Sequence, residues 1–151
     1  MQFSAITMIM NLKLTSKLTR QEASISTDTI QLQGDLMIPP QAQGIVLIAQ
    51  RRNIKCSYHS NLANFLYKAN LATLTINLLT PSEAIFDQRT RQLRFDAAGI
   101  LANRIVSITD WLRHTPETQH LPIGYFGEGT AGAAICHHSR HFIKPTSSQS
   151  N

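Results

Sequence analysis

The sequence predicts an α/β fold with a mostly parallel sheet. With 42% hydrophobic and only 15% charged residues, the 151-residue chain can fill a core, which excludes disorder of the whole. Residues 24–38 alternate like a β-hairpin, and short apolar runs then alternate with segments of helical periodicity. Such alternation favours parallel strands joined by right-handed crossovers. The expected order is a hairpin followed by β, α, β, α, β and α.

The hairpin is expected to bend near Gly34 and to end at Pro39, because proline cannot donate to a strand ladder. Residues 45–49 follow as five apolar residues without a polar break, which is typical of a strand covered on both faces. Residues 60–69 predict an amphipathic helix. Its expected apolar stripe consists of Leu62, Phe65, Leu66 and Ala69.

Alternation over residues 72–79 predicts the next strand, and Asp96 then serves as the expected N-cap of a long helix that reaches Arg113. Trp111 is expected to pack in or near the core. A strand over residues 122–127 enters a glycine-rich turn, and a last helix follows. The apolar stripe of the long helix consists of Leu101, Ile105, Ile108 and Leu112.

Composition limits the classes of function. The formal net charge of +5 is spread along the chain except at residues 51–55 and 89–94, which we interpret as solvated loops because no nucleic-acid-binding motif accompanies them. No apolar run approaches the roughly 18 residues of a membrane span. Cys56 and Cys136 form no disulfide framework, and Cys136 is expected to be buried in the last helix. Without a secretory signal, we expect a cytoplasmic protein.

Several stretches around the glycine-rich turn carry a family resemblance: 70–74, 78–81, 87–96, 109–118 and 121–127. Through them the chain resembles α/β-hydrolases of the dienelactone-hydrolase-like group, relatives of which are sometimes linked to phosphoribosyltransferase domains. The resemblance implies a partial α/β-hydrolase fold, the N-terminal half, over residues 24–142. Residues 1–23 are then a lead-in of uncertain structure, and residues 143–151 a disordered tail.

In that family the strand after the long helix ends in a nucleophile elbow, G-x-S-x-G, whose sharp turn needs small residues around the serine. Aligning Gly127 with the first glycine places Gly129 at the serine position and Ala131 at the closing position. Glycine has no nucleophilic atom. A second register makes Thr130 the nucleophile, but it places Glu128 where a small residue is required. We favour the first register.

The resemblance also implies an oxyanion-hole loop after residues 45–49, rich in glycine and preceded by histidine. Here Gln50 stands at the histidine position and Arg51 at the first glycine. Loss of one oxyanion donor typically costs on the order of 100- to 1000-fold in rate. The family's acid and histidine follow the serine on later strands, whereas this chain ends after the next helix. We therefore expect a truncated, catalytically degenerate chain.

Two histidines of the last helix, His137 and His141, have the i, i+4 spacing of a metal pair. No third ligand follows at a recognised spacing, so we expect solvent-exposed histidines in this helix, no metal site and no cofactor. The favoured interpretation is a hydrolase-like protein with little or no activity, whether selected or a frameshifted remnant. The alternative is a non-catalytic module. It would use the open sheet edge to dock on a second copy or on another protein, such as a phosphoribosyltransferase-like neighbour.

Overall fold

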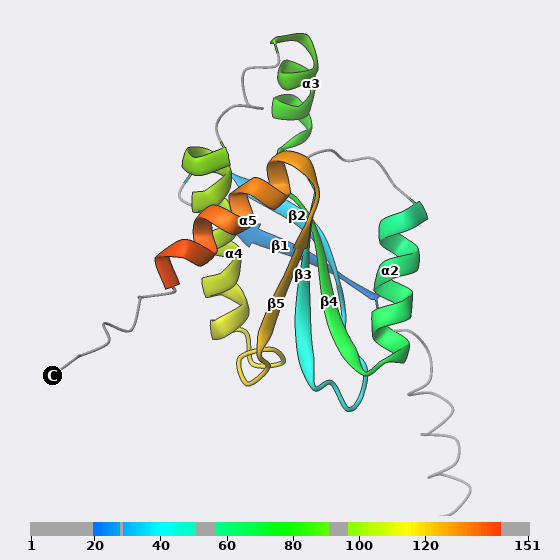
Figure 1. The fold of residues 1–151 in the computed structure, drawn as a ribbon. Helices are drawn as coiled ribbons and strands as arrows, with labels where there is room; N and C mark the ends of the chain where they lie inside the picture. Colours follow the sequence, from blue (N-terminus) through cyan, green and yellow to red (C-terminus); the bar gives the residue numbers. More distant parts are fainter. Residues whose placement is uncertain (1–19, 28, 51–56, 91–96, 143–151) are drawn as a thin grey trace, which may run out of the picture.

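A five-stranded mixed sheet forms the centre of the protein (Figure 1), in the strand order β1-β2-β4-β3-β5. The computed structural model describes residues 20–27, 29–50, 57–90 and 97–142. The pairs β1–β2 and β2–β4 are antiparallel, whereas β4–β3 and β3–β5 are parallel. The predicted class, a hairpin followed by parallel strands with flanking helices, is confirmed. The strands are β1 (Arg20–Ser26), β2 (Gln31–Met37), β3 (Gly44–Gln50), β4 (Leu71–Asn77) and β5 (Ile123–Gly127).

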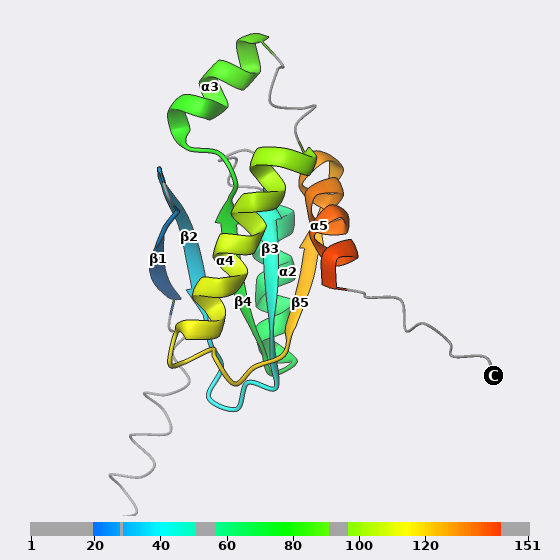
Figure 2. The same cartoon turned by 90° about the vertical axis from the view of Figure 1, so that its left-hand side faces the viewer.

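Helices cover both faces of the sheet. Helix α2 (Ser57–Lys68) lies on one face, whereas α4 (Ala102–His114) and α5 (Gly129–Phe142) lie on the other (Figures 1 and 2). A short π-helical segment (Ala97–Leu101) leads into α4. Helix α3 (Pro81–Thr90) projects beyond the sheet at the end where β4 finishes (Figure 2).

The larger apolar core lies between the sheet and helices α4 and α5. The predicted stripe of the long helix is confirmed, since each of its four residues is at most 1% exposed. Trp111 packs partly buried against the same core, as expected. Asp96, the predicted N-cap, lies outside the described residues.

A smaller core between the sheet and α2 contains Met37, Ile48 and Ala63. The predicted stripe of this helix is wrong at Phe65, which is 70% exposed, and at Ala69, which is exposed and follows the last residue of α2. The helix instead turns Ala63 to the sheet, and Phe65, two residues later, points roughly to the opposite side at 3.6 residues per turn. Periodicity alone did not identify the small residue as the centre of the buried face.

The hairpin differs from its prediction in the position of its turn. β1 begins at Arg20, inside the segment expected as a lead-in, and the chain turns where the Thr27 N–H donates to the Ile30 carbonyl oxygen (2.8 Å). The bend predicted at Gly34 is wrong, because Gly34 lies within β2. A Cβ atom there would stand 2.7 Å from the carbonyl oxygen of Thr75 on β4. Gly34 therefore allows a close approach of two strands.

Helix α3 was not predicted, although its first residues form a recognisable signal. The Thr80 N–H donates to Glu83 Oε2 (2.9 Å), and the Glu83 N–H donates to Thr80 Oγ1 (3.3 Å), which is a capping box. Pro81 occupies the first helical position, where its missing N–H has no intrahelical acceptor to lose. The Thr-Pro-Ser-Glu sequence therefore predicts a helix start where we expected only the end of a strand.

Arg104 of α4 ties this helix start to the body of the protein. Its guanidinium donates to both carboxylate oxygens of Glu83 (2.8 and 2.6 Å) and to the Leu78 carbonyl oxygen just after β4 (2.6 Å). Burial by itself would raise the pKa of Glu83. The hydrogen bonds and charge of Arg104, with the hydrogen bonds of Thr80, outweigh burial and hold that pKa below its usual value.

Candidate functional site

The glycine-rich turn joins the end of β5 to the start of α5. β5 ends at Gly127, Glu128 links the two elements, and α5 begins at Gly129. Gly129 has a φ of 57°, in the left-handed region that glycine adopts without steric cost. The chain thus makes a sharp strand-to-helix turn at this residue, which is the shape expected of a nucleophile elbow.

Small residues on both sides of Gly129 let the strand and the helix touch. A Cβ atom at Gly127 would lie 2.7 Å from Ile135 Cδ1 and 3.1 Å from the carbonyl carbon of Ala131. A Cβ atom at Gly132 would lie 2.7 Å from the Gly127 carbonyl oxygen. Ala131 itself is buried. These contacts explain why the turn requires glycine and alanine at the positions that flank it.

Gly129 is different from its neighbours because its surroundings are open. A Cβ atom built on it meets nothing within 4 Å, and the residue is exposed. A side chain at this position would project into free space, as the serine of an elbow does. Glycine supplies only a backbone N–H there. Thr130, the alternative nucleophile, is the second residue of α5 and is half-buried.

Gln50 lies at the same end of the sheet as this turn. It is the half-buried last residue of β3, and its carbonyl oxygen accepts a hydrogen bond from the Leu78 N–H (2.6 Å). Ala49 stands opposite Gly127 in the parallel pair of β3 and β5, so the chain continues from both strands at one edge. The sheet therefore brings Gln50 and the Gly129 turn to neighbouring strand ends. Arg51 lies outside the described residues.

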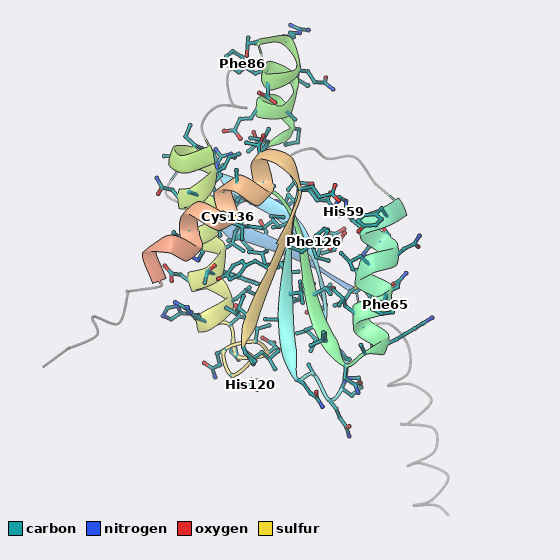
Figure 3. The ribbon with its side chains drawn as sticks, viewed as in Figure 1. His59, Phe65, Phe86, His120, Phe126 and Cys136 are labelled. Carbon is teal, nitrogen blue, oxygen red and sulfur yellow. The ribbon has the colours of Figure 1, made fainter. Side chains whose placement is uncertain are left out.

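An aromatic cluster that the sequence did not indicate lies beside β5. His59, in the first turn of α2, faces Phe126 with ring centroids 6.3 Å apart, and Tyr58 is 5.6 Å from His59 (Figure 3). Both ring nitrogens of His59 are shielded from solvent, and neither has a hydrogen-bond partner among the described residues. No sequence motif surrounds His59, so only the packing of α2 on the sheet could reveal it.

A second polar group crosses the larger core. Tyr125 Oη lies 3.0 Å from Thr109 Oγ1 on α4 and 3.3 Å from His138 Nε2 on α5. Thr109 is 1% exposed and His138 is 3% exposed. The expectation that the histidines of the last helix are solvent-exposed is therefore wrong for His138. Hydrogen bonds between these side chains link β5 to both helices on this face.

The phase of α5 explains these assignments. The buried residues Ala131, Ala134, Ile135 and His138 follow the i, i+3, i+4, i+7 spacing of one helical face. Cys136 falls off this face and is exposed, so its predicted burial is wrong. The side chains of His137 and His141 lie outside the described part of the structure.

No group of three or more His, Cys, Asp or Glu side chains in the described part of the chain could hold a metal ion. None of the helices described is long and apolar enough to cross a bilayer.

Curated relatives of this chain come from Mycobacterium tuberculosis, and no family model matches it. A protein named "Putative phosphoribosyl transferase" in strain H37Rv, and its counterpart in strain CDC 1551 / Oshkosh, are each 37% identical to the chain over 121 residues. The match includes 76% of this chain but 26% of each relative. The chain thus spans about a quarter of the length of these relatives.

Solved structures with a similar fold include several hydrolases. A dienelactone hydrolase from Anabaena variabilis is 43% identical, with a TM-score of 0.73 over 82% of this chain and 58% of its own. Est1E from Butyrivibrio proteoclasticus has a TM-score of 0.62 at 13% identity over 80% of this chain and 46% of its own. A dienelactone hydrolase-like promiscuous phosphotriesterase, P91, has a TM-score of 0.60 at 14% identity over 83% and 55%. At such low identity these last two show the fold alone. The resemblance in sequence to dienelactone hydrolases is confirmed.

Proposed function

We propose that this chain, which has the α/β-hydrolase fold of dienelactone hydrolases, has little or no hydrolase activity of its own. The observation that supports this is Gly129. It occupies the sharp turn between β5 and α5, with a φ of 57° and open space where a side chain would project. Covalent acyl transfer requires a nucleophilic oxygen or sulfur at that point, and glycine has neither.

The neighbouring residues support the same proposal. Thr130 belongs to the first turn of α5 and is half-buried, which favours Gly129 over Thr130 as the residue at the tip of the turn. Gln50 ends the strand before the loop that supplies backbone N–H groups to the oxyanion in relatives, and it is followed by arginine rather than glycine. Each such loss lowers the rate by orders of magnitude, and the losses act on one reaction.

Turnover of p-nitrophenyl acetate by the purified chain tests the proposal. We expect no release of p-nitrophenolate above that of a buffer blank at equal protein concentration. A fluorophosphonate probe should likewise fail to label the chain. The Thr130→Ala variant, with Thr90→Ala on exposed α3 as its matched control, distinguishes the two registers. Turnover that Thr130→Ala abolishes and Thr90→Ala preserves would contradict the proposal.

We propose as a second candidate function a non-catalytic module that docks through the outer edge of β5, the last strand in the order of the described sheet. The supporting observation is that every residue of β5 keeps some exposure, although the strand contains Ile123, Tyr125 and Phe126. In the mycobacterial relatives the matched segment is 26% of a longer chain. One candidate partner is therefore a phosphoribosyltransferase-like protein, and the other is a second copy. Titration of the purified chain with the full-length mycobacterial relative, followed by sedimentation velocity, tests the first of these.

A further inference from the structure

Three aromatic side chains meet where α2 begins and β5 ends. Tyr58 and His59 lie in the first turn of α2, and Phe126 is the fourth residue of β5. Figure 3 shows His59 and Phe126 next to each other, whereas Phe65 lies further along α2. Ligands of α/β proteins bind at the carboxyl ends of the parallel strands. The aromatic cluster therefore lies at the end of the sheet where a ligand is expected.

The three rings are spaced as walls around a common point. Their centroids are 5.6 Å apart for Tyr58 and His59, 6.3 Å for His59 and Phe126, and 6.4 Å for Tyr58 and Phe126. The two pairs that include His59 are inclined by 73° and 70°, and the third pair by 42°. At this spacing one atom can stand about 5 Å from all three centroids, inside the roughly 6 Å at which an aromatic face attracts a cation. The spacing and the tilt are compatible with a three-walled aromatic cage.

His59 takes part in this cluster through its ring. Nδ1 and Nε2 are both shielded from solvent, and neither has a hydrogen-bond partner among the described residues. A shielded polar atom without a partner lowers stability, so its presence requires an explanation. The recorded ring contacts of His59 are with Tyr58 and Phe126. An imidazole held in this way serves as an aromatic wall, which accounts for a histidine that makes no hydrogen bond here.

The cluster has one side in the core and one side in solvent. Phe126 packs partly buried against the smaller core, next to Met37, Ile48 and Ala63. Tyr58 is 52% exposed, although its ring could gain stability by burial. A small ligand can therefore reach the exposed side of the cluster while α2 stays packed on the sheet.

We propose that Tyr58, His59 and Phe126 bind the trimethylammonium group of a small ligand such as choline. A quaternary ammonium has no N–H group to satisfy, so ring faces alone can hold it, whereas a primary ammonium would also need hydrogen-bond acceptors. Glu128 is exposed and lies two residues beyond Phe126, a span of about 7 Å in extended chain, where its carboxylate attracts a cation. Binding of this kind goes beyond both candidate functions, since it requires neither a nucleophile nor a further strand.

Titration of choline with the full chain, followed by the proton resonance of the choline methyl groups, tests the proposal. The ring currents of the aromatic walls should move this resonance upfield, with a dissociation constant on the order of 1 mM. Neohexyl alcohol, in which a tert-butyl group replaces the trimethylammonium group, has the same shape without the charge. It should bind at least about 10-fold more weakly, because only the cation is attracted by the ring faces.

Two substitutions on one helix separate the cluster from the rest of the surface. Tyr58→Leu removes the exposed wall and should weaken choline binding by about 10-fold. Phe65→Leu, the matched control, removes a ring that is 70% exposed on the same helix but away from the cluster, and it should leave binding unchanged. His59→Phe keeps an aromatic wall without the nitrogens and should preserve binding. Thermal unfolding followed by circular dichroism checks that each variant folds.

The source of the trimethylammonium group is decided by comparing choline with the free amino acid trimethyllysine. Tighter binding of choline supports a small soluble ligand, whereas tighter binding of trimethyllysine would overturn that assignment in favour of a methylated protein side chain. Absence of a methyl shift, equal binding of neohexyl alcohol, unchanged binding in Tyr58→Leu, or loss of binding in His59→Phe would each overturn the cage itself. Turnover of p-nitrophenyl acetate is measured separately, so failure of this proposal and failure of the proposed lack of activity are distinguishable.

Discussion

The two end strands of the sheet, β1 and β5, differ in the burial and the charge of their side chains. β1 has one apolar face, with Ala23 and Ile25 buried, and its remaining residues are exposed and mostly polar. Arg20 and Glu22 place charges on its exposed face. β5 has apolar side chains towards both faces, no charge, and no fully buried residue. One strand ends a sheet and the other has the composition of a strand inside one.

This difference indicates where the protein can be extended. Alternation of apolar and charged residues makes β1 a poor template for pairing, because a further strand would have to cover charged side chains. β5 lacks this protection and lies directly before the Gly129 turn. Any strand added at β5 therefore lies next to the candidate site, whereas nothing added at β1 could.

The largest expected effect on the free energy of unfolding comes from replacing a glycine by alanine near one edge of the sheet. Gly34 on β2 and Gly124 on β5 allow the same substitution to be compared near both edges. Gly34→Ala should lower the free energy of unfolding by about 3 kcal/mol, because its Cβ would stand 2.7 Å from a backbone oxygen of β4 and must force the hairpin outward. Gly124→Ala on β5 meets only ordinary contacts and should stay within about 1 kcal/mol of the parent. Urea denaturation measures both. Equal losses would show that the two ends are equally tightly packed.

The second prediction concerns how β5 is held to its helices. Tyr125→Phe removes the hydroxyl that lies between Thr109 and His138. Both buried side chains then lose their hydrogen bond to Tyr125. We expect a loss of about 1 to 2 kcal/mol in the free energy of unfolding. Tyr58→Phe, at a residue that is 52% exposed, is the matched control and should change little. An unchanged stability in Tyr125→Phe would mean that these side-chain hydrogen bonds contribute little to holding β5 against its helices.

A third prediction concerns a variant in which β1 is made uncharged like β5. The double variant Arg20→Val and Glu22→Val removes the charges from the exposed face of β1, so β1 should become a template for pairing. Light scattering of the double variant should then show association that rises with protein concentration, compared with the parent chain at the same concentrations. The free energy of unfolding should change by less than about 1 kcal/mol, because both side chains are exposed. Absence of association would show that charge is not what protects β1.

The smallest effect is expected from Arg20→Ala. Arg20 Nη2 lies 2.5 Å from Asp35 Oδ2, but both side chains are well exposed, and exposed ion pairs contribute about 0.5 kcal/mol or less. The hydrogen bond from Arg20 to Asp35, opposed by slight burial, raises the pKa of Arg20, which keeps it protonated throughout the usual pH range. Urea denaturation should therefore show a loss of about 0.5 kcal/mol or less in Arg20→Ala, and high salt should abolish it because ions screen an exposed pair. A loss above 1 kcal/mol would mean that Arg20 serves mainly to stabilise the fold through its ion pair with Asp35, and not to prevent further strands from pairing with β1.

Much of the fold could be predicted because its signals are local. The apolar run of residues 45–49 and the stripe of α4 identify a buried strand and a buried helix face from spacing alone. The candidate site was also accessible to sequence, since the small residues around Gly129 form one short pattern. Even α3 had a local signal in Thr80 and Glu83.

The remaining features depended on contacts between residues far apart in the sequence. Gly34 resembles a turn glycine until β4 is placed beside it, and Phe65 resembles a core residue until Ala63 is seen against the sheet. His138 is buried and Cys136 is exposed, the reverse of what the sequence predicted, because the sheet and α4 fix which face of α5 is buried. Sequence determined the order of the strands and of the helices other than α3, because each depends on the spacing of neighbouring residues. Tertiary structure decided which faces of the helices are buried and which strands stand at the two ends of the described sheet, because those depend on what packs against them.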